Sequence, residues 1–171
     1  RKNLPKNFKQ GRKTGGGTPG TGTMEKYFGV CYYPELYPKE KQEAFIREDI
    51  ENMRRARFNV VRMAEFCWCL MEPREGVYDF DWLEEIVDRL GQNGIYTVLC
   101  TPTACQPVWM ARRYPETLYV DNLGVQRSYG GRHYHCYNSP VFRVFTEKIC
   151  LEMSRRFGRN PYVLGFQVDN E

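Results

Sequence analysis

Short apolar runs alternate with amphipathic segments along most of the chain, and this alternation constrains the fold more than any other feature. Runs rich in β-branched, aromatic and cysteine residues begin at positions 27, 60, 96 and 163. After each of the first three, apolar side chains recur at helical spacing. The first three onsets lie roughly 35 residues apart, the length of one strand–helix unit with its loops. The sequence therefore predicts an α/β fold with a parallel sheet.

These patterns place the individual elements. Strands are predicted at 27–33, 60–66, 96–100 and 163–171, the first of them buried on both faces. One helix is predicted over 39–57, and a second, capped by Asp79 and Asp81, ends at Gly91 to Gly94. A helical turn follows at 109–114. The last helix ends at Gly158 and turns five residues inward, namely Phe142, Phe145, Ile149, Met153 and Phe157.

Four such units make about half of an eight-stranded (β/α)8 barrel, which needs about 200 residues or more. A half-barrel would expose two parallel strand edges and an open core. We therefore expect residues 24–171 to be the N-terminal half of a truncated barrel domain, with a doubly wound sheet as the structural alternative.

Residues 1–23 differ in composition from the rest of the chain. They carry six basic residues, no acidic residue, and a run of Gly and Thr that buries almost nothing. We expect a flexible leader, whether a natural tail, a cloning remnant or translated upstream sequence. The remainder has 19 basic against 21 acidic residues, so the net charge of +4 predicts no nucleic-acid partner.

Two further features of the sequence bear on the cellular compartment of the protein. No stretch approaches the ~18 apolar residues of a membrane helix, and no secretory signal is visible, so no membrane partner is predicted. The seven cysteines are odd in number and form no C-x-x-C pair. Cys31, Cys100 and Cys150 are expected to be small core residues. A cytoplasmic location is the simplest expectation.

Polar and aromatic residues gather where the predicted strands end, and such ends carry the functional groups of parallel α/β proteins. Arg62, several carboxylates and aromatic rings in these places suit a sugar. Glu171 closes an apolar run that can raise the pKa of a carboxylic acid, so it is the candidate general acid/base. The alternative is a structural carboxylate that caps a helix or pairs with Arg62. Asn170 can hydrogen-bond a sugar hydroxyl.

Glycoside hydrolysis needs two carboxyl groups. Asp169 and Glu171 would share one strand face and approach the sugar from the same side, so this pair is rejected. Glu35 and Glu65 are predicted to orient their neighbours, which leaves the nucleophile outside this chain. Four aromatic residues are candidates either for the pocket or for the core, namely Tyr32, Phe66, Trp68 and Trp109.

Cys67-x-Cys69 and Cys136 raise the question of metal binding, and Cys136, which lies in a polar loop, is the candidate ligand. Its spacing to other residues supplies no set of four zinc ligands. His133 and His135 in the same loop are left unassigned.

Several long motifs in one order carry a family resemblance. They are GVCYYPELYP (29–38), VVRMAEFCWCLMEPREGVYDFDWL (60–83), GIYTVLCTPTACQPVWM (94–110), GGRHYHCYNSP (130–140) and GFQVDNE (165–171). From Phe28 to Glu171 the chain resembles the N-terminal part of glycoside hydrolase family 42 β-galactosidases.

The resemblance implies a (β/α)8 barrel that hydrolyses terminal β-galactosides with retention. Glu171 matches the family's acid/base, while Arg62 and Asn170 match positions that hold the galactose. The nucleophile would lie beyond residue 171. Some members carry a structural zinc for which Cys136 matches one ligand, with three more expected beyond the chain end; no cofactor is required for catalysis. Complete members are commonly trimers.

Two other functions remain open. Another retaining hydrolase of the same clan, such as a β-glucosidase, β-mannanase or arabinosidase, is the alternative enzyme. A short, non-catalytic sugar-binding fragment is the alternative from a different class. Substrate stereochemistry comes from the resemblance alone.

Overall fold

The computed structural model describes residues 26–170, so the predicted leader at 1–23 lies outside the described residues. The four strands are β1 (Gly29–Cys31), β2 (Val60–Met63), β3 (Tyr96–Cys100) and β4 (Val163–Gln167). The α-helices are α1 (Lys39–Arg55), α2 (Trp68–Met71), α3 (Asp81–Gln92), α4 (Val108–Arg113) and α5 (Pro140–Phe157). Three short 3-10 turns lie at Pro34–Leu36, Pro102–Ala104 and Pro115–Thr117. The predicted alternation of strand and helix is confirmed.

The four strands form one parallel sheet in the order β1-β2-β3-β4. The register places Cys31, Arg62 and Val98 side by side across the first three strands. Because paired residues of parallel strands point to the same face, these three side chains share one face, while Val61 and Met63 point to the other. Strand order and register therefore decide which side chains can meet at the carboxyl edge.

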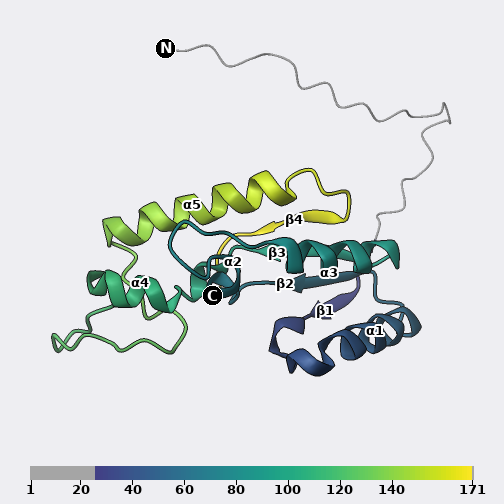
Figure 1. The fold of residues 1–171 in the computed structure, drawn as a ribbon, viewed down its shortest axis with the longest axis horizontal. Coiled ribbons are helices and arrows are strands. Elements are labelled where there is room, and N and C mark those ends of the chain that lie inside the picture. The colour runs from purple at the N-terminus through teal and green to yellow at the C-terminus, as the bar shows by residue number, and fades with distance from the viewer. Residues whose placement is uncertain (1–25, 171) are drawn as a thin grey trace, which may run out of the picture.

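The long helices α1, α3 and α5 follow β1, β2 and β3 and lie beside the sheet (Figure 1). Their buried residues share one core with Val61, Met63 and Leu99, which all point to the same side of the sheet. Within residues 26–170, no long helix packs on the opposite face. A doubly wound sheet carries helices on both faces, so sequential strand order with helices on one face favours the barrel over this alternative.

Helix α5 forms as its sequence pattern predicts. The Ser139 side chain caps its start by accepting a hydrogen bond from the Phe142 N–H at 3.3 Å, and Pro140 occupies the first turn. All five predicted inward residues are buried, and the helix ends at Gly158 as expected. The helix thereby covers β3 and β4 and fixes their position in the sheet.

Helix α3 ends within the predicted range Gly91 to Gly94, but its start is capped differently from the prediction. Its N-cap is Phe80, with no side-chain cap; Asp79 Oδ1 accepts the Asp81 N–H at 3.2 Å, while Asp81 is the first helical residue. At the other end, a Cβ on Gly91 would stand 2.0 Å from the Tyr162 ring, so Gly91 permits close packing inside the last turn. Gly94, with φ of 77°, makes the turn into β3.

The expectation that the first strand is buried on both faces is wrong. β1 covers only Gly29–Cys31, and all three residues are exposed. It lies at the edge of the sheet and pairs only with β2, and the face opposite the helices is open. Cys31 is consequently an exposed thiol instead of a core residue, whereas Cys100 is buried and Cys150 is half-buried.

The open face of the sheet forms an apolar hollow of about 420 Å³. Strand residues line most of it, including Val60, Val98 and Leu164, with Arg62 at its polar end. In a closed barrel this face fills the interior.

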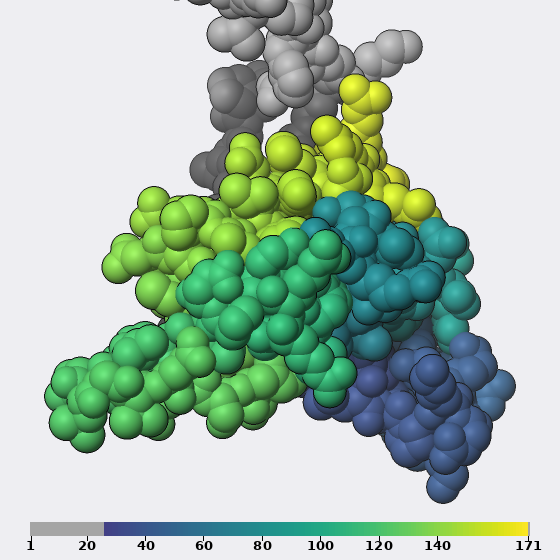
Figure 2. Space-filling model, turned by 60° about the vertical axis from the view of Figure 1, so that its left-hand side comes forward, coloured from purple at the N-terminus to yellow at the C-terminus, as the bar shows by residue number. Residues whose placement is uncertain are grey.

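The segment between the last 3-10 turn and α5 projects from the body as a green lobe (Figure 2). It is held by single bridges, Leu118 with His135 and Val120 with Gln126. In the described part of the chain, no helix is long and apolar enough to cross a membrane.

Candidate functional site

Arg62 is the centre of a polar network at the carboxyl edge of the sheet. Its Nη2 donates to Glu65 Oε1 at 2.7 Å and its Nη1 donates to Gln167 Oε1 at 2.8 Å. The same Nη1 lies 3.3 Å from Asn170 Oδ1, and Nε lies 3.3 Å from Cys31 Sγ. One guanidinium group thus ties β2 to β1 and to the end of β4.

Glu65 is the buried partner that holds this network in place. It is fully buried, and its Oε1 accepts hydrogen bonds from Arg62 and from the Tyr33 hydroxyl, both at 2.7 Å. The preceding residue, Ala64, has a φ of 84°, which is costly for a residue with a Cβ. That backbone conformation ends β2 at Met63, three residues before the predicted end. Glu65 therefore orients Arg62 and Tyr33 and presents no exposed carboxylate.

The chain after β4 turns away from the strand at Asp169, whose φ is 58°. The strand ends at Gln167, so the predicted strand to residue 171 is too long, and the assumption that Asp169 continues its alternation is wrong. Gln167 Nε2 donates to the Asp169 carbonyl at 2.9 Å and lies 3.3 Å from Asn170 Oδ1. Gln167 thus stabilises the turn that presents Asn170.

Thr101 and Thr103 hold the same turn from the end of β3. The Asp169 N–H donates to Thr101 Oγ1 at 2.7 Å, and Thr103 Oγ1 donates to Asp169 Oδ1 at 2.8 Å. On its outer side, Asp169 Oδ2 accepts from the Tyr137 hydroxyl at 3.3 Å. Asp169 is therefore a structural partner of its neighbours.

The electrostatics of the site follow from these contacts. The hydrogen bond to Cys31 and the Glu65 carboxylate raise the pKa of Arg62 against the opposing effect of desolvation, the largest single influence, so its charge is retained. The hydrogen bond to Glu65 raises the pKa of Tyr33 to about 12, so its phenol remains a donor. Burial raises the pKa of Glu35. The site therefore offers a fixed cation and several hydrogen-bond donors at neutral pH.

This arrangement suits a neutral polyhydroxylated ligand. The Arg62 side chain is 28% exposed while its partner Glu65 is fully buried, so the guanidinium is both fixed and reachable. Asn170 is half-buried and can offer amide hydrogens beside it. Fixed donors and acceptors at a strand edge are the groups that bind sugar hydroxyls in an orientation-dependent way.

Of the predicted site residues, Arg62 and Asn170 lie together and Glu171 lies outside the described residues. Cys136 is a half-buried free thiol in the projecting loop. Between residues 26 and 170, no group of three or more His, Cys, Asp and Glu side chains is placed to hold a metal ion. These residues alone do not form a zinc site, and the ligand role of Cys136 stays a prediction.

The four candidate aromatic residues separate into two groups. Trp68 is fully buried, Trp109 packs on Phe145, and the Tyr32 hydroxyl donates to Asp49 of α1. These three residues therefore lie on the side of the sheet that the helices cover. Phe66 stacks on Tyr33 with ring centroids 6.3 Å apart and borders a hollow with the loop at Gly130. Only Phe66 among the four lies at the edge that carries Arg62.

Sequence reasoning missed Gln167, Tyr33 and the Thr101–Thr103 pair as members of the site. A signal existed for Gln167, because it is the single polar side chain in the apolar run 163–168. The two threonines follow β3 at the same edge as Arg62, but nothing in the sequence shows that they contact Asp169.

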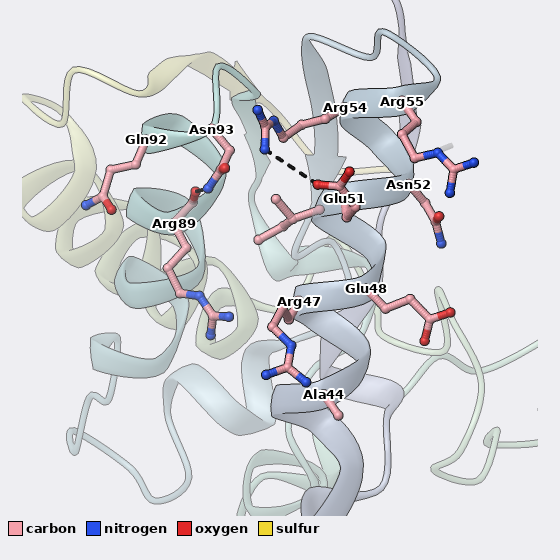
Figure 3. Close-up of a pocket in the computed structure, with 11 residues that line it drawn as sticks. Ala44, Arg47, Glu48, Glu51, Asn52, Arg54, Arg55, Arg89, Gln92 and Asn93 are labelled. Carbon is pink, nitrogen blue, oxygen red and sulfur yellow. Dashed lines mark hydrogen bonds and ion pairs between the residues drawn. The ribbon is translucent and has the colours of Figure 1, made fainter.

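A larger hollow, of about 790 Å³, lies elsewhere (Figure 3). It separates α1 from α3, and Arg47, Arg54 and Arg89 point into it. Arg89 pairs with Glu43, and Arg54 lies 3.5 Å from Glu51. The hollow is a solvated surface between two helices and lies far from the carboxyl edge of the sheet, so it is not the candidate site.

Comparisons with known proteins converge on one family. The model of glycoside hydrolase family 42, described as β-galactosidase, matches residues 31–171. The β-galactosidase of Thermus thermophilus is 45% identical over 143 residues, covering 84% of this chain and 22% of that protein. The β-galactosidase BgaH of Haloferax lucentense is 42% identical, with 84% and 21% covered.

The solved structures agree. The cold-adapted β-galactosidase from Rahnella sp. R3 has a TM-score of 0.79 at 37% identity, covering 84% of this chain and 21% of that one. The chain spans about a fifth of the length of the relatives it matches.

Proposed function

The chain belongs to glycoside hydrolase family 42, and on that premise we propose that the complete protein hydrolyses terminal β-D-galactosides with retention of configuration. Its three strand–helix units and fourth strand are the N-terminal part of a (β/α)8 barrel. The observation that carries the proposal is the contact of Arg62 with Asn170, which brings a fixed cation and an amide to the residue directly before Glu171.

In this proposal Arg62 and Asn170 bind hydroxyl groups of the non-reducing galactose. Gln167 and Glu65 hold the guanidinium in place, so little side-chain entropy is lost when the sugar binds. Neither Glu65 nor Asp169 serves as nucleophile, since both are engaged in hydrogen bonds within the network. The nucleophilic carboxylate belongs to a part of the family barrel that this chain does not contain.

Glu171 acts as the general acid and then as the general base. As an acid it protonates the glycosidic oxygen while the second carboxylate attacks the anomeric carbon and forms a galactosyl ester. As a base it takes a proton from water, whose oxygen then displaces the ester and releases galactose with its original configuration.

The test uses the complete protein with matched nitrophenyl β-glycosides. Release from the galactoside, with the β-anomer seen first by NMR, supports the proposal. Preferential release from the glucoside, mannoside or arabinoside would identify a related glycosidase instead. Absence of hydrolysis of every substrate by folded protein would favour a non-catalytic sugar-binding role.

The role of Glu171 is tested separately with Glu171→Gln. A general acid matters most when the leaving group is poor, so kcat/KM should fall much more for lactose than for dinitrophenyl galactoside. Equal, small losses on both substrates would assign Glu171 to structure.

Three further properties belong to the same proposal. All seven cysteines are free thiols, which supports a reducing, cytoplasmic location. A homotrimer and a structural zinc at Cys136 are proposed for the complete protein on family membership alone. Sedimentation and metal analysis of that protein test them.

A further inference from the structure

We propose that Asp169 is a positioning residue, locked by Thr101 and Thr103, that holds Asn170 against Arg62 at the position directly before the proposed acid/base Glu171. The inference rests on the proposed function, because it concerns the geometry of proton transfer by Glu171. It adds two threonines that follow β3 and an aspartate that follows β4, and their contribution to the reaction comes through their neighbours.

A closed ring of hydrogen bonds carries the inference. The Asp169 N–H can only donate, and it donates to Thr101 Oγ1 at 2.7 Å. The Asp169 carboxylate can only accept, so the 2.8 Å contact with Thr103 uses the Thr103 hydroxyl proton. The remaining 3.3 Å contact between the two hydroxyls must therefore run from Thr101 to Thr103. Each hydroxyl donates once and accepts once within this ring.

The ring fixes a backbone conformation that the chain would not otherwise favour. Asp169 has a φ of 58°, in the left-handed region, where Asp and Asn are tolerated better than other residues with a Cβ. Both threonines are buried, so their hydroxyls are held by packing and shielded from competing water. The ring thus holds the main chain and the side chain of Asp169 at once.

The fixed turn is transmitted to the catalytic groups. Gln167 donates to the Asp169 carbonyl at 2.9 Å, and Arg62 and Gln167 both reach Asn170 Oδ1 at 3.3 Å. Asp169 is thereby held from β3 on one side and from β4 on the other. A change in its conformation would turn Asn170, the residue directly before Glu171, away from Arg62.

β3 also supplies a matched control. Thr97 lies on the helix side of the same strand and is fully buried, and its hydroxyl has no hydrogen-bond partner in the described part of the chain. Thr97→Val removes the same atom as Thr101→Val, from the same strand, without touching the ring. It separates the effect of the ring from that of altering a buried threonine.

The experiment compares kcat/KM for lactose and for dinitrophenyl β-galactoside in the complete protein. Misplacement of a reacting group by about 1 Å can cost about 100-fold. Thr101→Val and Thr103→Val should therefore lose about 100-fold on lactose and clearly less on the activated substrate, which feels only the weaker galactose binding by Asn170, with little change in melting temperature. Thr101→Ser should restore most of the loss, and Thr97→Val should match the wild type.

Variants at Asp169 separate the hydrogen bond from the backbone conformation. Asp169→Asn keeps an acceptor oxygen and tolerance of positive φ, so it should stay within a few-fold of the wild type. Asp169→Gly keeps only the tolerance of positive φ, and Asp169→Ala loses both, so losses on lactose should increase in that order.

The possible results are distinct. If losses are equal on both substrates, or follow melting temperature across the series, the ring is structural and the inference is overturned. If Thr101→Ser folds properly but loses as much activity on lactose as Thr101→Val, the Thr101 hydroxyl is not responsible for the effect, and the inference is again overturned. If the wild-type protein hydrolyses no glycoside, the proposed function has failed, and the ring is then judged by melting temperature and the Arg62–Asn170 contact in a crystal structure.

Discussion

Removing both members of the Arg62–Glu65 ion pair should cost less than the sum of the two single removals. With Arg62→Met, the fully buried Glu65 carboxylate keeps only the Tyr33 hydroxyl as a partner. Loss of one partner from a buried pair costs about 3–5 kcal/mol. Because 28% of the Arg62 side chain is exposed, water screens part of this effect. We expect about 2 kcal/mol of destabilisation.

Glu65→Gln removes the buried charge but retains an acceptor for Tyr33. In the double variant no uncompensated carboxylate remains, so its destabilisation should fall short of the sum of the singles by about 1–2 kcal/mol. Urea unfolding of the complete protein, followed by circular dichroism, measures this coupling. Arg89–Glu43, a bidentate pair whose Glu43 side chain is 72% exposed, is the control pair and should show a smaller coupling. Additive effects at Arg62 and Glu65 would refute the reasoning.

Three more predictions concern stability and reactivity. Burial raises the pKa of Glu35 in the folded state, so the contribution of Glu35 to stability declines as the pH rises above about 4.3, the pKa of an unfolded glutamate. In urea unfolding, Glu35→Gln should therefore gain stability relative to the wild type between pH 4 and 7. A difference in unfolding free energy that stays constant over this range would contradict the prediction. Burial raises the pKa of the Cys100 thiol to about 12 and that of Cys67 as well, so both should react with a thiol reagent only after unfolding, as mass spectrometry of labelled peptides can check. Phe157→Ala removes a fully buried ring from the core under α5 and should lower the free energy of unfolding by about 3–5 kcal/mol, measurable from the urea midpoint. A loss below 1 kcal/mol would mean that the core collapses into the space left by the ring.

The fold could be predicted where one physical effect dominated a segment. The five apolar residues of α5 recur at helical spacing, and burial of that face determines both the helix and its orientation. β1 shows the opposite case. Its apolar run resembles a buried strand, yet its exposure depends on strand order and on an open sheet face, which no local pattern contains.

The site was predictable in part for the same reason. Arg62 and Asn170 are polar residues next to apolar strands, so their place at the carboxyl edge follows from the strand pattern. The turn at Asp169 does not, because alternation was assumed to continue to residue 171 while the positive φ at Asp169 breaks it. The ring with Thr101 and Thr103 joins residues that are 66 and 68 positions apart, and the sequence alone does not disclose such a contact.

The contacts of Arg62 also have a consequence for the order of folding. Glu65 is three residues away, so this ion pair can form as soon as β2 has left the ribosome, whereas Asn170 is 108 residues further along. At about 5–20 residues per second, synthesis delivers Asn170 roughly 5–20 seconds later. During that interval the Arg62–Glu65 pair gives the nascent chain a prearranged docking point for β4. Among the described contacts of Arg62, those with Gln167 and Asn170 are thus the last that synthesis allows to form.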